Sequence, residues 1–390
     1  MNRRPIPNLP SPKILYLSDV DITSPGGAQE SMKLIIDALA EEFDFYLLAP
    51  KGTPINDHHI TLSQYNNFIL RGKKINELIS LLKDMRKTIK EVNPNIIHLQ
   101  MPSTLVLINV LLRLWLIKRS TKIVYTDRGV YGKYGRLTTM SINSLIKKAN
   151  KVVTTTHRNL NNYRKLFKYF KSHESKFEVI YNTAGKSFDE FNEHKREQIR
   201  KTYGLKLTDT VLGFCGRFTD QKDWPLAFEL IKSCAHEYEN VSFLLVLGTD
   251  GTDKNYQEAT EYSQQLKDIL GDKVKVFLNL DNSEVAELYY AMDIFVLTSK
   301  WESFGRTAVE AMSRKNAVIG RDVDGLSEVI GDKEFLFNSK EEFKTIVTRM
   351  LTNKEELKRA QAHFFARYHK EFGYQKNIDQ YRSLYKKLLE

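Results

Sequence analysis

Two glutamates with seven residues between them, Glu302 and Glu310, are the first candidates for chemistry in this sequence. They flank Ser303, Phe304 and Gly305, where glycine allows close backbone approach and the unpaired amides at the start of a helix bind anions. A phosphate group is the anion that such a site favours. Because Glu310 lies about two turns along the predicted helix, both carboxylates can contact one elongated ligand.

The elements predicted around these glutamates support a ligand site. The apolar runs Ile294 to Leu297 and Ala317 to Ile319 indicate two buried parallel strands, which makes the intervening stretch their crossover helix. Two glutamates at this spacing also occur on ordinary solvated helices. The setting of strand, glycine and second strand is what favours binding.

Two cations, Arg217 and Lys222, follow another predicted strand, Val211 to Gly216. Permanent positive charges at the carboxyl end of a strand suit a diphosphate. The next strand, Phe243 to Gly248, ends in a glycine turn. Without a bound anion, the two cations would be a plain surface pair.

The first predicted strand, Lys13 to Ser18, is followed by Gly26 and Gly27 and then by an amphipathic helix from about Ala28 to Glu41. A glycine pair at a strand-to-helix turn admits a ligand, and a tight turn explains it about equally well. The pattern is neither a dinucleotide fingerprint nor a P-loop, because the required glycine and lysine spacings are absent.

A polar segment with Asp127, Arg128 and Tyr131 leaves the predicted strand Ile123 to Thr126 at its carboxyl end. Ligands of parallel α/β sheets lie beyond this end of the strands, so these residues are active-site candidates. A simple ion pair between Asp127 and Arg128 is the alternative.

Strand and helix alternate along the whole chain, which predicts an α/β fold with doubly wound parallel sheets. At 390 residues the chain favours two domains over one. A charged helix from Asp189 to Tyr203 marks the boundary. The other predicted elements are the strands Phe45–Ala49, Ile96–Gln100, Val152–Thr155, Phe177–Tyr181 and Val274–Leu278 and the helices Ile75–Lys90, Leu137–Ala149 and Lys354–Leu389.

Positive charge is concentrated in the first half of the chain. Residues 1–185 carry 28 Lys and Arg against 14 Asp and Glu, whereas residues 186–390 carry 31 against 34, so the net charge of +11 arises from the first half. A lipid surface, a lipid diphosphate or an acidic glycan would each fit as partner. Nucleic acid fits less well, because no nucleic-acid-binding motif accompanies the charge.

One basic segment also carries apolar residues, which suits peripheral contact with an anionic bilayer. The segment contains Arg164, Lys165, Lys168 and Lys171 beside Leu166, Phe167 and Phe170.

The cysteines, the first residues and the longest apolar run give expectations about metal binding, secretion and membrane spanning. Cys215 and Cys234 lack metal-ligand spacing, so free thiols in a reducing cytoplasm are expected. The stretch from Met1 to Pro12 is polar and proline-rich, unlike a secretory signal. The apolar run from Thr104 to Ile117 is interrupted by polar residues and is shorter than the roughly 20 residues of a spanning helix.

The segment from Glu302 to Glu310, with Phe304-Gly305 inside it and Ala311-Met312 after it, resembles the Glu-x7-Glu signature of the retaining GT-B glycosyltransferases, particularly family four. The turn from Gly325 to Glu328 matches the Gly-x-x-Glu turn of that family. The resemblance covers most of the chain and is strongest from Val211 to Ile330.

The resemblance implies a fold of two Rossmann-like doubly wound parallel-sheet domains with a cleft between them. Residues 1–185 would bind the acceptor and residues 186–365 the nucleotide sugar. A C-terminal helix, residues 366–390, would cross back to the first domain.

The resemblance also implies roles for individual residues. Arg217 and Lys222 would hold the donor phosphates, Glu302 would bind sugar hydroxyls near the reacting carbon, and Glu310 would accept hydrogen bonds from the ribose. The expected donor site further contains Gly26, Gly27, Gly248, Leu278, Ser303, Phe304 and Gly305. Catalysis would also involve Asp127, which with Arg128 stands where many relatives carry a histidine, and the acceptor would contact Arg128 and Tyr131.

The expected function is transfer of a hexosyl or N-acetylhexosaminyl group from a nucleotide sugar, UDP-linked rather than GDP-linked, to a saccharide or lipid-linked acceptor. The product would be a cell-surface polysaccharide or glycolipid. No metal, other cofactor or nucleic acid is expected, and the expected location is the cytoplasm or the inner face of the cell membrane.

Two alternatives remain open. The pairs Asp19 with Asp21 and Asp322 with Asp324 fit a metal-dependent transferase of a different fold, because paired carboxylates hold Mg²⁺ or Mn²⁺ on a diphosphate. A non-enzymatic basic α/β module that binds acidic glycan or nucleic acid would explain the charge, but it leaves Arg217, Lys222 and the two glutamates unexplained.

Overall fold

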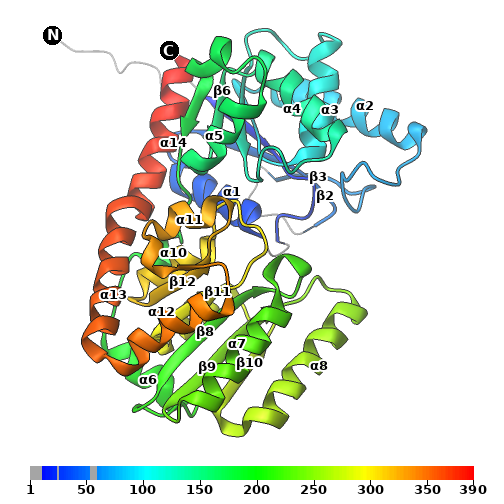
Figure 1. Cartoon of the computed structure of the whole chain (residues 1–390). Coiled ribbons are helices and arrows are strands. Elements are labelled where there is room, and N and C mark those ends of the chain that lie inside the picture. Colours follow the sequence, from blue (N-terminus) through cyan, green and yellow to red (C-terminus); the bar gives the residue numbers. More distant parts are fainter. Residues whose placement is uncertain (1–10, 24–25, 53–58) are drawn as a thin grey trace, which may run out of the picture. The chain divides into compact units, whose positions relative to one another are not determined.

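The computed structural model describes residues 11–23, 26–52 and 59–390, and strands alternate with helices along most of them (Figure 1). The chain forms two compact units. Unit 1 comprises Met1–Thr154, Leu160–Ile180 and Ile378–Glu390, and unit 2 comprises Thr155–Asn159 and Tyr181–Asn377.

Unit 1 contains a parallel sheet with the strand order β3-β2-β1-β4-β5-β6-β7. Its strands are rich in fully buried apolar residues, as a parallel sheet covered on both faces requires. The chain moves outward from β1 to β3 and then returns to the other side of β1, so the switch point lies between β1 and β4. The strands are β1 (Lys13–Leu17), β2 (Asp44–Pro50), β3 (His59–Leu62), β4 (Ile96–Leu99), β5 (Lys122–Asp127), β6 (Lys151–Thr154) and β7 (Phe177–Val179).

The helices of unit 1 connect these parallel strands. They are α1 (Gly27–Leu39), α2 (Ile75–Val92), α3 (Pro102–Arg113), α4 (Arg136–Lys148) and most of α5 (His157–Leu166). Helices α3 and α4 pack side by side, where Arg113 Nη2 donates to Ser144 Oγ at 2.9 Å. No helix among the described residues is both long enough and apolar enough to span a bilayer.

The last part of α14 (Tyr374–Leu389) belongs to the core of unit 1. The Tyr385 hydroxyl lies 2.7 Å from His98 Nδ1 and 2.5 Å from the Tyr16 hydroxyl, and all three side chains are fully buried. Burial lowers the pKa of His98 well below its usual value, with a further contribution from the charge of Arg128. Helix α14 therefore docks on the sheet through a neutral polar network surrounded by aromatic rings.

Unit 2 contains a second parallel sheet, with the order β10-β9-β8-β11-β12-β13. Its switch point lies between β8 and β11, because the chain runs outward from β8 to β10 and then returns to the other side of β8. The strands are β8 (Thr210–Arg217), β9 (Val241–Gly248), β10 (Val274–Leu278), β11 (Ile294–Leu297), β12 (Ala317–Arg321) and β13 (Leu336–Phe337).

The helices of unit 2 cover this sheet (Figure 1). They are α6 (His194–Thr202), α7 (Trp224–Glu237), α8 (Asp253–Leu270), α9 (Asn282–Leu288), α10 (Arg306–Ser313), α11 (Asp324–Ile330), α12 (Lys340–Thr352) and α13 (Lys354–Arg367). The buried Asp293 stabilises the start of this unit by accepting hydrogen bonds from Arg196 at 2.6 Å and from the Val211 amide at 2.8 Å.

The predicted α/β fold with two doubly wound parallel sheets is confirmed. The helix expected from Asp189 is wrong at its start, since α6 begins at His194. Asp189 instead accepts a hydrogen bond from the Tyr368 hydroxyl at 2.5 Å. Several elements were not predicted. Among them, strands β3 and β13 are very short and helix α3 is apolar almost all round.

We expect Tyr385→Ala to destabilise unit 1 by about 3 to 5 kcal/mol, because it empties a buried aromatic site and leaves the Nδ1 atom of His98 without its hydrogen-bond partner. Hydrogen exchange in peptides from β1 and β4 should become roughly a hundredfold faster or more. Tyr256→Ala, at a half-exposed position on α8, is the control. Unchanged exchange in the Tyr385 variant would contradict this account of α14.

Candidate functional site

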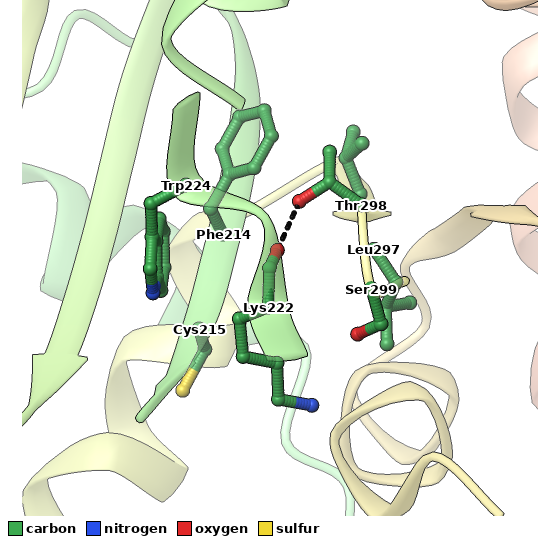
Figure 2. A pocket seen from close by; sticks show the side chains of 8 residues that line it. Phe214, Cys215, Lys222, Trp224, Leu297, Thr298 and Ser299 are labelled. Carbon is green, nitrogen blue, oxygen red and sulfur yellow. Dashed lines mark hydrogen bonds between the residues drawn. The ribbon is translucent and has the colours of Figure 1, made fainter. Parts of the chain in front are cut away.

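The two strands at the switch point of unit 2, β8 and β11, diverge before they reach their carboxyl ends. β11 pairs with β8 only at Leu212 and Gly213, whereas β8 stays paired with β9 along its whole length. The divergence opens a small pocket beneath the loops that follow the two strands (Figure 2). Its lining residues are Phe214, Cys215, Lys222, Trp224, Val296, Leu297, Thr298 and Ser299.

Lys222 and Glu302 form an ion pair beside this pocket. Lys222 Nζ lies 2.7 Å from Glu302 Oε2, and the two side chains are only 15% and 11% exposed. Gly216 leaves room for the lysine, since a Cβ there would lie 3.1 Å from Lys222 Cε. Mutual pairing avoids an isolated buried charge on either residue. The structure thus brings together two residues that were expected to belong to one site.

Hydrogen bonds to backbone carbonyls join the loop after β8 to the loop after β11. Thr298 Oγ1 donates to the Lys222 carbonyl at 2.7 Å, which is the dashed line in Figure 2. The Lys300 amide donates to the Gln221 carbonyl at 2.8 Å, and Gln221 Nε2 donates to the Trp301 carbonyl at 3.0 Å. These bonds fix the backbones that carry Lys222 and Glu302.

Close packing against α11 positions the segment that precedes α10. The Gly325 amide donates to the Glu302 carbonyl at 2.9 Å, and a Cβ on Gly325 would lie 1.9 Å from the Ser303 carbonyl oxygen. Phe304 is buried in the core of unit 2, so its ring is not available to a ligand. Gly305 caps α10 with a left-handed φ of 90°, which glycine adopts without strain.

Glu310 lies within α10 and is held by two neighbours. The Tyr289 hydroxyl donates to its Oε2 at 2.9 Å, and Arg306 Nε lies 3.0 Å from its Oε1. The Cys215 thiol also lies near Glu310, and burial, aided by that carboxylate, raises its pKa to about 12. Cys215 is thus a neutral thiol between the Lys222 and Glu310 sides of the site.

Arg217, Gly248 and Leu278 end three neighbouring strands of unit 2, at the same edge of the sheet. The Arg217 side chain is exposed and forms no ion pair with any described residue. Its carbonyl accepts from Trp224 Nε1 at 3.0 Å. The Gly248 carbonyl accepts from the Phe218 amide at 2.6 Å, which ties the loop after β8 to β9.

The remaining candidates belong to unit 1. Gly26 and Gly27 stand at the start of α1, after the described part of the β1 loop, and Ser24 and Pro25 lie outside the described residues. Arg128 follows β5, and its Nε donates to Gln100 Oε1, at the end of β4, at 2.9 Å. All of these lie at the carboxyl edge of that sheet.

The structure argues against the predicted direct contacts of Asp127 and Tyr131 with substrates. Asp127 is fully buried, and its carboxylate accepts from Tyr163 at 2.7 Å, from Tyr125 at 3.2 Å and from Tyr134. Burial and the nearby carboxylate raise the pKa of all three tyrosines well above the usual value, so they stay protonated donors. Tyr131 is also buried, stacked on Tyr163 with centroids 3.9 Å apart.

The two aspartate pairs that suggested a metal site serve other contacts. Asp19 accepts from the Ser103 and Thr104 amides at 2.8 and 2.7 Å and so caps α3. The Glu302 amide donates to Asp324 Oδ2 at 3.3 Å. Among the described residues, no group of three or more His, Cys, Asp or Glu side chains is arranged to hold a metal ion.

Several residues that shape this site were not singled out in the sequence. Tyr289 precedes β11 in an apolar stretch, and nothing in its spacing indicates a contact with Glu310. Gly216 and Thr298 occupy strand ends, where position relative to a predicted strand offers a weak signal. Glu328, by contrast, was named in the Gly-x-x-Glu turn, and it accepts hydrogen bonds from the His157 and Arg158 amides at 2.8 and 2.6 Å, so it caps α5.

Two protein-family models match successive parts of this chain. Residues 25–184 match the model described as Glycosyltransferase Family 4, and residues 195–363 match the model described as Glycosyl transferases group 1. An uncharacterized glycosyltransferase of Methanocaldococcus jannaschii is 32% identical over 165 residues, which are 41% of this chain and 40% of the relative. A 2-deoxystreptamine glucosyltransferase of Streptomyces kanamyceticus is 31% identical over 35% of this chain and 34% of its own length. These alignments span well under half of either relative.

Two solved structures share the fold over nearly the whole chain. Sucrose-phosphate synthase from Thermosynechococcus elongatus has a TM-score of 0.79 at 17% identity and covers 97% of this chain and 99% of its own. HepE of Anabaena, in complex with UDP-glucose, has a TM-score of 0.75 at 18% identity and covers 96% of this chain and 99% of its own. With two family matches that together cover most of its length, the chain belongs to the glycosyltransferases of the GT-B fold and the family 4 type.

Proposed function

We propose that the protein transfers a hexosyl or N-acetylhexosaminyl group from a nucleotide diphosphate sugar to a saccharide or lipid-linked acceptor, with retention at the anomeric carbon. UDP is favoured over GDP as the nucleotide, because the similar HepE fold is known with UDP-glucose. The product would be a cell-surface polysaccharide or glycolipid made at the cytoplasmic side of the membrane.

The observation that carries this proposal is the Lys222–Glu302 ion pair at the switch point of unit 2, 2.7 Å long and largely buried. The pair keeps a cation and a carboxylate together where ligands of doubly wound sheets bind. A diphosphate competes with Glu302 for Lys222, and the displaced carboxylate is then free to accept hydrogen bonds from the sugar hydroxyls. This single exchange of partners would leave Lys222 bound to the diphosphate and Glu302 free to bind the sugar.

Charge that develops on the leaving diphosphate is the main electrostatic demand of this reaction. Lys222, the exposed Arg217 and the first amides of α10, at Arg306 and Thr307, supply fixed positive potential without a metal ion. Because the hydrogen bonds to the backbone around Lys222 hold its loop in place, little reorganisation is needed when the charge appears.

Glu310 would bind the ribose hydroxyls, with Tyr289 keeping the carboxylate in position. The Tyr289 hydroxyl donates a hydrogen bond to Glu310 Oε2 at 2.9 Å. This bond fixes the plane of the carboxylate and leaves its other lone pairs for the ribose. Asp127, in contrast, would support the loop after β5 from below rather than contact the sugar. Arg128, at the carboxyl edge of the unit 1 sheet, would contact the acceptor.

A panel of nucleotide sugars tests this function directly. We expect one UDP-sugar to raise the unfolding temperature and to be turned over with an axial or equatorial product linkage that matches the donor, as seen by NMR. Activity should persist in EDTA. Salt-sensitive binding of polyanions without hydrolysis or transfer from any nucleotide sugar would favour the non-enzymatic alternative, which the carboxylate and cation pairs of unit 2 do not support.

Replacing Arg217 or Lys222 with Ala should lower kcat/KM by about 10² or more, because each acts on charge that grows in the transition state. The matched control is Lys300→Ala, which removes a cation from the neighbouring loop, where Lys300 pairs with Asp220. Steady-state rates and circular dichroism give the comparison. Wild-type rates in both site variants would rule out this phosphate clamp.

The two glutamates should respond differently to neutralisation. Glu310→Gln should weaken binding of UDP itself, since the ribose is bound equally in the ground and transition states, whereas Glu302→Gln should mainly lower kcat. Because Glu302→Gln also frees Lys222 from its partner, UDP affinity should stay equal or increase. Calorimetry with UDP measures both, and the opposite pattern would show that the roles are reversed.

Tyr289→Phe should reduce UDP affinity about tenfold or more, the value of one lost hydrogen bond to a charged group. Tyr290→Phe is the matched control, because the adjacent Tyr290 is equally buried and its hydroxyl instead donates to the Glu190 carbonyl at 3.1 Å. Both variants should lose similar stability in urea, while only the first loses affinity. Equal affinity losses would assign Tyr289 a purely structural role.

A further inference from the structure

Three loops of unit 1 carry most of the net charge of the protein. They are residues 113–122, 147–151 and 168–176, which lead into β5, β6 and β7. Together these 24 residues contain ten Lys or Arg and one acidic residue, a net charge of +9, whereas the whole chain has +11. The basic excess is therefore a local feature of one region.

The sheet brings these three loops to the same edge. β5 pairs with β6 and β6 with β7, all parallel, so their amino ends lie next to one another. Contacts between the loops agree with this placement. Lys176 Nζ donates to the Lys147 carbonyl at 3.0 Å, and Lys151 Nζ donates to the Ser175 carbonyl at 3.3 Å. We call the region the amino-edge surface.

Little negative charge offsets this surface. Its acidic residue, Glu174, is paired with Arg164 at 3.3 Å, and within the described part of the chain none of the ten cations forms an ion pair. The pKa of Lys148 is lowered by burial and by the charge of Arg113. Cations this close repel one another, and an anionic partner would relieve that repulsion.

Exposed apolar and aromatic side chains stand among these cations. Leu114 is 59% exposed, Trp115 is 71% exposed and Tyr169 is 45% exposed. The guanidinium of Arg119 lies 4.5 Å from the Trp115 ring centroid, and Lys147 Nζ lies 4.2 Å from that of Tyr169. Trp and Tyr beside Lys and Arg are the residues enriched where proteins meet the polar layer of a bilayer.

We propose that the amino-edge surface binds the face of an anionic phospholipid bilayer. The cations match the headgroup charge, and Trp115 and Leu114 gain by leaving water for the interface. A soluble polyanion would use the cations but would leave the exposed Leu114 and Trp115 unburied, so the apolar residues favour the bilayer.

This surface replaces part of the segment expected from sequence. Phe167 and Phe170 are buried in the core of unit 1 and cannot enter a membrane, whereas Lys168 and Lys171 do belong to the exposed edge. The surface lies at the opposite edge of the sheet from Gly26, Gly27 and Arg128. The proposal therefore stands independently of the proposed sugar transfer.

Vesicle sedimentation tests the charge. The full chain should bind vesicles with one quarter phosphatidylglycerol in phosphatidylcholine at low salt, ignore pure phosphatidylcholine, and dissociate in 1 M salt, where the screening length falls to about 3 Å. Joint replacement of Arg119, Lys147, Lys168 and Lys171 by Gln should lower the partition coefficient at least about a hundredfold. The matched control replaces Lys201, Lys206, Lys254 and Lys267 of unit 2, which are equally exposed, and should bind like wild type.

A second pair of variants separates the bilayer from a soluble polyanion. Trp115→Ala should weaken vesicle binding about tenfold while leaving heparin binding unchanged, and Tyr256→Ala in unit 2 should change neither. Unfolding temperatures check that all variants fold. The proposal is overturned if wild type ignores anionic vesicles at low salt, if the quadruple variant binds them like wild type, or if Trp115→Ala has no effect.

Discussion

The candidate site depends on the parting of two parallel strands, β8 and β11, before their carboxyl ends. Separated strands leave a pocket, and the loops beyond them must then be held together by other contacts. The Lys222–Glu302 ion pair and the Thr298–Lys222 hydrogen bond supply these contacts. The charged residues proposed to bind a nucleotide sugar thus also join the two loops at this edge of the sheet.

Glycine positions complete this arrangement because backbone and side chains approach too closely for a Cβ. Gly216 gives the Lys222 stem room against β8, and Gly325 lets α11 approach the backbone before α10. The pocket wall, the ion pair and the start of α10 are consequently coupled. A change at any of these glycines should alter the spacing between the phosphate and sugar ends of the site.

The two edges of the unit 1 sheet have different chemical character. Its carboxyl edge holds glycine turns and buried polar networks, such as the three tyrosines around Asp127. Its amino edge holds exposed cations with Trp115 and Tyr169. A parallel sheet separates these edges by the length of its strands, so one unit can present a ligand edge and a contact surface without interference.

Local pattern was enough to predict much of this protein. Alternating apolar runs and helical periodicity predicted both parallel sheets, and the position of Arg217, Lys222 and Gly248 at strand ends predicted one ligand edge, since parallel strands end together. The spacing of Glu302 and Glu310 placed the first before the crossover helix and the second about two turns along it. All of these inferences use residues close in sequence.

Contacts between distant residues were decided by the tertiary structure. Lys222 and Glu302 are 80 positions apart, and their pairing depends on how far β8 and β11 diverge. Tyr289 donates to Glu310, and Asp127 is buried with Tyr163 as one of its three tyrosine donors. Both contacts depend on how helices pack against their neighbours, which no local pattern specifies. Phe167 and Phe170 were expected on the basic surface but are buried. The reason is the same, since burial is a property of the whole core and not of one helix.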